Sequence, residues 1–117
     1  MSKYKIDLTF KPFLKNLKKL KKKFKNAGND VSEILSQLED NAPLGTPIPH
    51  ISEPVYKVRV RNTSIPKGKS GGFRLIYKFD EERRIITPML FYSKTEKSDA
   101  PIQDIEEALK ALFDDDE

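Results

Sequence analysis

The sequence predicts one α+β domain whose strands and helices follow in the order β-α-α-β-β-β-α. Its 117 residues suffice for one domain and are too few for two ordinary ones. Some segments alternate apolar and polar residues, as strands do, and others repeat apolar residues at helical spacing. Strands joined by short connections pair as antiparallel hairpins. We therefore expect a mainly antiparallel sheet, with two N-terminal helices and one C-terminal helix packed on one face.

The first two elements are a strand and a basic helix. Lys3–Phe10 alternates, with its apolar residues on one side, which predicts a strand. Lys11–Lys25 has apolar residues at helical spacing, and Pro12 lies where a first helical turn accepts proline. The other side of this helix is lysine: Lys11, Lys15, Lys18, Lys19, Lys21, Lys22, Lys23 and Lys25.

A second helix is expected after a break at residues 26–29. Asp30 and Glu33 have the spacing of a capping box, which predicts that this helix begins at Asp30. Its apolar stripe ends near Asn41. The following segment, residues 42–54, carries four of the eight prolines and predicts a rigid connection.

Three strands are expected next: Val55–Arg61, Gly72–Asp80 and Arg84–Ser93. A hairpin turn at Asp80–Arg83 joins the last two. Pro88 lies inside the third strand, and because proline cannot donate a ladder hydrogen bond, it predicts a sheet edge or a bulge.

The final element is a helix over Pro101–Phe113, for which Asp99 is a plausible N-cap. Residues 1–113 are expected to form the single domain, and Asp114–Glu117 a frayed acidic tail.

Charge is distributed unevenly along the chain. Residues 1–97 hold 21 Lys and Arg against 10 Asp and Glu, a balance of +11, while residues 98–117 hold one lysine against eight acids, a balance of −7. A basic body attracts polyanions, of which nucleic acid is the commonest. There is no cysteine, signal peptide or apolar run long enough to cross a bilayer, so we expect a cytoplasmic location.

A cluster of cations is predicted on one face of the sheet. Lys57, Arg59 and Arg61 alternate onto one face of their strand, and Arg74 lies in the strand expected to pair with it. Lys67 and Lys69 lie in the loop between the two strands. Each cation alone could be a solvated side chain. Because like charges gathered together are destabilising, the cluster favours an anionic partner.

Other sites are less well supported. The GKS at 68–70 is not a nucleotide-binding loop, because Thr63 stands where the motif needs glycine and a strand follows where it needs a helix. His50 is the single histidine, lies among prolines and is more typical of a structural residue. No metal-ligand spacing is present, so neither a metal nor another cofactor is expected. The lysine helix could present a solvated face, contact an anionic membrane, or contact nucleic-acid phosphates.

Two blocks resemble one family. VYKVRVRNTSIPKGKSGGFRLIYKFDEE, residues 55–82, and ITPMLFYSKTEKSD, residues 86–99, are similar to the RelE/HigB-type toxins of bacterial type II toxin–antitoxin modules, in the RelE/ParE superfamily. KSGGFRLIY and FYSKTEK are the specific parts. The resemblance covers most of the chain and implies the RelE/ParE-like fold, whose order of elements is the one predicted above. The inserted NTSIPKGK loop departs from RelE proper, and Tyr92–Lys94 lacks the histidine of some relatives.

The resemblance implies a ribosome-dependent mRNA endoribonuclease, an mRNA interferase, in which a ribose 2′-OH attacks the adjacent phosphate without a metal. Arg74 matches the arginine of the family's strand and is expected to clamp the phosphate. Arginine cannot act as the base, so a lysine would have to: Lys57, Lys67 or Lys69. The implied catalytic residues are Arg74, Lys57, Lys69, Tyr92 and Lys94, and the implied nucleic-acid contacts are Arg59, Arg61, Lys67, Lys18, Lys19 and Lys22.

The implied partners are a cognate antitoxin protein and mRNA on the ribosome, with contacts to ribosomal RNA. Two alternatives stay open. One is a ParE-like toxin that inhibits DNA gyrase and cuts nothing, and the other is an RNA-binding module without activity.

Overall fold

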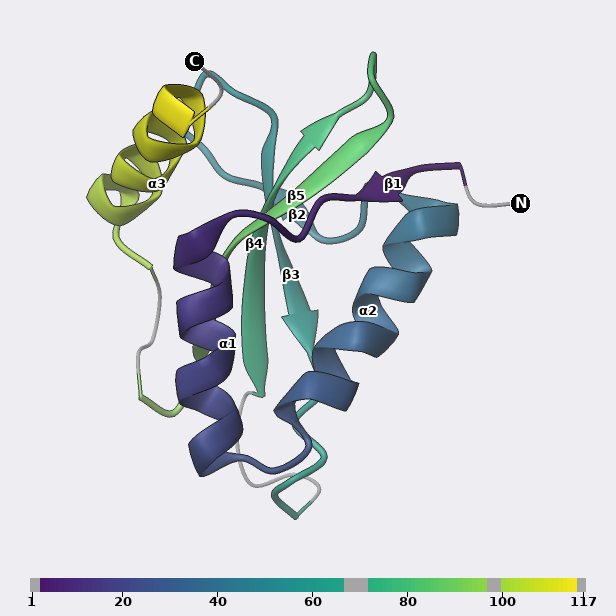
Figure 1. Cartoon of the computed structure of the whole chain (residues 1–117), viewed down its shortest axis with the longest axis vertical. Coiled ribbons are helices and arrows are strands. Elements are labelled where there is room, and N and C mark those ends of the chain that lie inside the picture. Colours follow the sequence, from purple (N-terminus) through teal and green to yellow (C-terminus); the bar gives the residue numbers. More distant parts are fainter. Residues whose placement is uncertain (1–2, 67–71, 97–99, 116–117) are drawn as a thin grey trace.

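The computed structural model describes residues 3–66, 72–96 and 100–115 of the chain. It contains a mixed five-stranded sheet with the strand order β1-β5-β4-β3-β2 and three helices (Figure 1). The elements in chain order are β1 (Lys5–Ile6), α1 (Lys11–Lys23), α2 (Ala27–Asn41), β2 (Thr46–Pro47), β3 (Val55–Val60), β4 (Phe73–Asp80), β5 (Ile85–Ser93) and α3 (Ile102–Asp115).

The predicted α+β class and mainly antiparallel sheet are confirmed. β2, β3, β4 and β5 pair antiparallel in sequence order, and β1 pairs parallel with β5 at the other edge. β4 lies in the middle of the sheet. Phe73 through Tyr77 are all buried, which fits the position of this strand between β3 and β5.

The face of the sheet that carries Phe73, Leu75, Tyr77 and Phe91, here called the helix face, packs against α1 and α2. The Phe73 and Phe91 rings lie 4.9 Å apart, centroid to centroid. Phe24, which ends α1, stacks edge-on against Phe73 at 5.4 Å. These contacts form the aromatic centre of the core.

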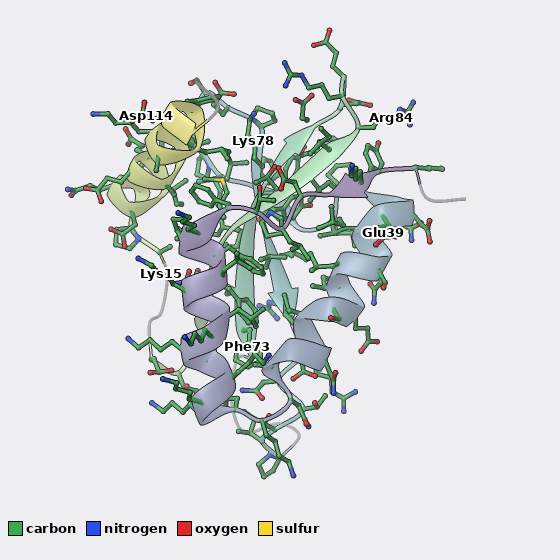
Figure 2. All side chains as sticks on the ribbon, in the orientation of Figure 1. Lys15, Glu39, Phe73, Lys78, Arg84 and Asp114 are labelled. Carbon is green, nitrogen blue, oxygen red and sulfur yellow. The ribbon has the colours of Figure 1, made fainter. Side chains whose placement is uncertain are left out.

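The third helix corrects the expectation that all helices share one face. Lys78 alternates with Tyr77 on β4 and therefore points to the opposite side of the sheet, here called the outer face. Its ammonium lies 5.1 Å from the centroid of the Phe113 ring on α3. Lys78 is labelled beside this helix in Figure 2. α3 thus covers part of the outer face and leaves the rest for other uses.

Several boundaries differ from the sequence expectation. β1 is two residues long instead of eight, and Leu8 beyond it is 45% exposed. α2 begins at Ala27 rather than Asp30, so the chain breaks earlier than expected. β2 lies in the segment expected to be a rigid connection. α3 continues to Asp115, which makes the start of the expected acidic tail helical.

Pro88 is accommodated as a bulge, one of the two outcomes predicted for it. In the pairing of β4 with β5, Tyr77 lies opposite Pro88 while Ile76 lies opposite Leu90, so Met89 is an extra residue on β5. Beyond this point Phe91 faces the helices and Tyr92 faces outward. The bulge therefore sets the phase of the last part of β5.

Candidate nucleic-acid site

Two arginines lie directly opposite each other on the outer face. The register of β3 and β4 pairs Arg59 with Arg74, and β5 continues the row with Tyr92. Side chains opposite each other in an antiparallel pair have Cβ atoms about 4.5–5.5 Å apart, and like charges in this position are destabilising. The expected pairing of Arg74 with the basic face of the preceding strand is thus present.

These arginines line a cleft of about 500 Å³ at the β2 side of the sheet. Its charged lining residues are Lys57, Arg59, Arg74 and Lys94, and the remainder are Gly45, Thr46 and Val58. Among the described residues no acidic side chain lines it. The cleft therefore gathers four cations from three strand segments that are distant in sequence, which suits an anionic ligand.

Arg74 and Arg59 differ in how they meet the solvent. Arg74 is 6% exposed, and its guanidinium donates a hydrogen bond of 3.1 Å to the Phe73 carbonyl. Arg59 is exposed, and Lys57 and Lys94 are partly buried. Arg74 therefore forms the floor of the cleft. A buried guanidinium with a fixed orientation is suited to hold two oxygens of a phosphate at once.

Gly45 and Thr46 form one side of the cleft, here called the wall. Thr46 pairs with Lys57 across the β2–β3 ladder. Gly45 has φ of +86°, and a Cβ on it would lie 2.1 Å from the Lys57 carbonyl oxygen. Only glycine allows the two backbones to approach so closely. The Gly45 backbone therefore packs directly against the backbone of Lys57.

A second glycine, Gly72, connects Lys94 with the start of β4. Gly72 precedes β4 with φ of +72°, and a Cβ there would lie 2.7 Å from the Val60 carbonyl oxygen. The Lys94 amide donates to the Gly72 carbonyl at 2.9 Å. This bond joins Lys94, the first residue after β5, to Gly72, the residue before β4. It therefore keeps the Lys94 backbone near the end of β4 that carries Arg74.

Not all of the expected site residues line this cleft. Arg61 follows β3 and is exposed. The Tyr92 hydroxyl accepts a 3.3 Å hydrogen bond from the Ala100 amide and lines a separate cavity of about 380 Å³, together with Asp104 and Glu107. Lys67 and Lys69 lie outside the described residues, as does Asp99.

The lysines of α1 form a different surface. Because Phe13 and Phe24 turn one side of α1 toward the helix face, the lysines lie on the side away from the sheet, as Lys15 does in Figure 2. Lys18, Lys19 and Lys22 are all exposed. The structure therefore separates them from the cleft.

The sequence did not reveal how Thr63 and Ser64, which follow β3, are held against α2. Asp30 is buried, and its carboxylate accepts bonds from the Thr63 amide at 2.9 Å and the Thr63 hydroxyl at 2.7 Å. Asn26 adds bonds to Thr63 and Ser64. Asp30 is therefore a tie between α2 and the end of β3, not the cap that its spacing to Glu33 predicted.

None of the helices within residues 3–66, 72–96 and 100–115 has the length and apolar content that a bilayer crossing needs. Within the same residues, no group of three His, Asp or Glu side chains is arranged to hold a metal ion.

The fold places the chain in a recognisable class, the small α+β proteins with a RelE-like sheet and helices. Compared with solved structures, the chain is similar to a free-state mutant of the Escherichia coli toxin RelE with two arginine-to-alanine substitutions. The TM-score is 0.60 at 16% sequence identity, over 96% of this chain and 99% of that chain. No known family model matches the chain, and no curated protein matches it. The predicted RelE-like fold is confirmed, while the HigB-type assignment stays a prediction.

Proposed function

We propose that this protein is the toxin of a toxin–antitoxin system and cuts mRNA on the ribosome as a metal-independent endoribonuclease. The observation that carries the proposal is the cationic cleft, in which Arg59 and Arg74 lie opposite each other with Lys57 and Lys94 beside them. Like charges kept together without an acidic residue among the described lining residues are expected where a polyanion binds. The RelE-like fold supports the same function.

The proposed reaction is attack of a ribose 2′-OH on the adjacent phosphate. The 2′-oxygen bonds to phosphorus and loses its proton to a base, while the bond to the 5′-oxygen breaks and that oxygen takes a proton from an acid. Charge increases on the phosphorus oxygens in the transition state, and fixed cations stabilise it most where they need not reorient. Arg74, at the floor of the cleft, is the proposed clamp for these oxygens.

The proton-transfer groups are assigned with the same chemistry. Arginine stays protonated, so the proposed base is a lysine. Two described lysines, Lys57 and Lys94, line the cleft, and Lys57 is the proposed base. Lys69 is kept as a proposed catalytic residue from the family resemblance. Lys94 is the proposed proton donor, because it lines the same cleft as Arg74. Tyr92 lies opposite Arg74 on the ladder but would have to exchange its bond to Ala100 to act there.

The test is induced expression in bacteria with sequencing of RNA 5′ ends. The wild type is expected to arrest growth and to produce cuts within translated mRNA. Arg74→Ala is expected to relieve arrest by reducing cleavage about 100-fold or more, as loss of a transition-state charge contact does. Arg83→Ala is the matched control, because Arg83 is an exposed arginine on the β4–β5 turn, away from the cleft.

Growth arrest without any cleavage of translated mRNA would refute the nuclease proposal. A supercoiling assay with purified protein then separates the gyrase-inhibiting alternative. RNA binding that weakens with salt, in the absence of toxicity, would indicate an inactive binding module.

The proposed partners follow from this function. A cognate antitoxin would neutralise the protein, and mRNA and ribosomal RNA would contact its basic surfaces. Lys18, Lys19 and Lys22 on α1 are proposed contacts to RNA outside the cleft, together with Arg61 and Lys67.

A further inference from the structure

One buried side chain of the core forms hydrogen bonds with the residue that precedes the wall of the cationic cleft. Tyr77 on β4 is fully buried on the helix face. Its hydroxyl donates a hydrogen bond to the Leu44 carbonyl and accepts one of 2.8 Å from the Leu44 amide. One hydroxyl therefore satisfies both backbone groups of Leu44, the residue directly before the wall.

The segment around the wall has other restraints besides this hydroxyl, since the Ile48 amide donates to the Val55 carbonyl at 2.9 Å and both Leu44 and Ile48 are partly buried against the core. β2 pairs with β3 through only two residue pairs, and one of its members is Pro47, which has no amide to donate. Two-residue strands add little stability by themselves. On the N-terminal side of the wall, the hydrogen bonds that fix the Leu44 backbone come from the Tyr77 hydroxyl.

The close contact at Gly45 transmits that position to the cleft. Because the Gly45 backbone lies directly against the Lys57 carbonyl, a shift of Leu44 moves Gly45 and Thr46 relative to Lys57. Thr46 and Lys57 both line the cleft. The width of the cleft at this end thus depends on a tyrosine on the opposite face of the sheet.

We propose that Tyr77 is a positioning residue for the site, which holds the wall at Gly45 and Thr46 at the distance from Lys57 that a single RNA strand requires. It acts through Leu44 and does not touch RNA. The proposal rests on the proposed function for the identity of the ligand, but the role of Tyr77 in fixing the wall can be measured without it.

The test compares Tyr77→Phe with Tyr56→Phe. Tyr56 stacks on Tyr77 with ring centroids 5.8 Å apart and lies on the same face, and no hydrogen bond joins its hydroxyl to any described residue. Both variants lose one hydroxyl from the same aromatic pair. Only Tyr77→Phe loses the bonds to Leu44.

The first measurement is amide hydrogen exchange. In Tyr77→Phe the Leu44 amide is expected to exchange about tenfold faster or more, relative to the core amide of Leu75, because only a local opening is needed. Tyr56→Phe is expected to leave the ratio unchanged. Equal ratios in Tyr77→Phe and the wild type would overturn the proposal.

The second measurement is binding of a labelled 2′-O-methyl oligonucleotide, which cannot be cut because it has no 2′-OH. Tyr77→Phe is expected to weaken binding about three- to tenfold, since the cleft is no longer preorganised. In ribosome-dependent cleavage it is expected to raise KM with kcat within about twofold. Faster exchange at Leu44 with unchanged affinity would overturn the link to the site.

The two proposals fail in different ways. If the wild type neither binds the oligonucleotide nor cuts mRNA, the proposed function is lost. The exchange ratio at Leu44 then still decides whether Tyr77 fixes the wall.

Discussion

β3, β4 and β5 supply side chains to both faces of the sheet, and the two faces differ in the kind of side chain they carry. On the helix face the facing side chains are Phe73, Leu75 and Phe91, which are buried against α1 and α2. On the outer face the same strands place Arg59 opposite Arg74, beside Lys57. The first arrangement lowers the free energy of folding through burial, whereas the second raises it through repulsion between like charges.

This difference shows where the molecule gives up stability. Part of the outer face is covered, since Ile76 is fully buried and α3 lies over Lys78. The cationic part is left open at the β2 side, although covering it with apolar residues would be more favourable for folding. Two arginines placed opposite each other at an open surface are expected to serve a function, which is the physical basis of the proposal made above.

The largest change in the free energy of unfolding is expected at Phe73, on the helix face. Phe73→Ala removes a fully buried ring that contacts both Phe24 and Phe91, so we expect a loss of about 3–5 kcal/mol in the free energy of unfolding. Urea denaturation followed by circular dichroism measures it. Phe113→Ala is the control, because that ring is 41% exposed and should cost far less. Similar losses in both variants would contradict the assignment of the core to the helix face.

A smaller loss is expected when the tie between α2 and the end of β3 is removed. Asp30→Ala leaves the Thr63 amide and hydroxyl without their acceptor, which we expect to cost about 2–3 kcal/mol. Glu33→Ala on the same helix is the control, because Glu33 is exposed. If Asp30 acted only as a helix cap, thermal unfolding of a double variant with Thr63→Val would show additive effects instead of coupled ones.

Alkaline pH tests the buried hydroxyl that supports the cleft. Burial raises the pKa of Tyr77 from 10.0 to about 12, against the opposing effect of its hydrogen bond to Leu44. Between these values the folded chain keeps a proton that the unfolded chain releases. The contribution of Tyr77 to the free energy of unfolding is therefore fully present below pH 10. It is lost as the pH rises toward 12, by roughly 2 kcal/mol.

The variant Tyr77→Phe has no hydroxyl to ionise, so it should lack this contribution to the change of stability with pH. Urea midpoints measured as the pH rises from 10.0 toward about 12, the two pKa values of Tyr77, are expected to fall less steeply in Tyr77→Phe than in Tyr56→Phe. Equal slopes would show that Tyr77 ionises as easily in the folded chain as in the unfolded one.

The smallest effect on stability, and the sharpest contrast with the helix face, is expected at Arg59. Arg59→Leu relieves the repulsion with Arg74 and should stabilise the fold by about 0.2–1 kcal/mol while it lowers mRNA cleavage. Thermal unfolding and cleavage assays on the same preparation measure both. A variant that loses stability and keeps its activity would contradict the division between the two faces.

The sequence was informative where the pattern is local. Alternation was enough to group Lys57 with Arg59 on one face of their strand and to put Arg74 in the strand that pairs with it. That Arg59 and Arg74 share a face was a condition of the predicted cluster, and the register shows it. The lysine helix was also recognisable, because its apolar residues recur at helical spacing.

The features that the sequence did not reveal depend on contacts between distant residues. Asp30 has the spacing of a cap, yet its partner is Thr63, 33 positions away. β2 has too few residues to show any alternation, and what makes Gly45 significant is its contact with Lys57. The face chosen by α3 could not be predicted either, because its apolar stripe fits either side of the sheet.

The bulge at Met89 has a further consequence for how such a chain can change over time. Because one extra residue shifts the alternation, it decides that Phe91 joins the core and Tyr92 the opposite side. A lineage that lost this residue would exchange the two roles at once. Insertion and deletion at this position are thus a route by which a related chain could acquire a different set of exposed groups without altering its other strands.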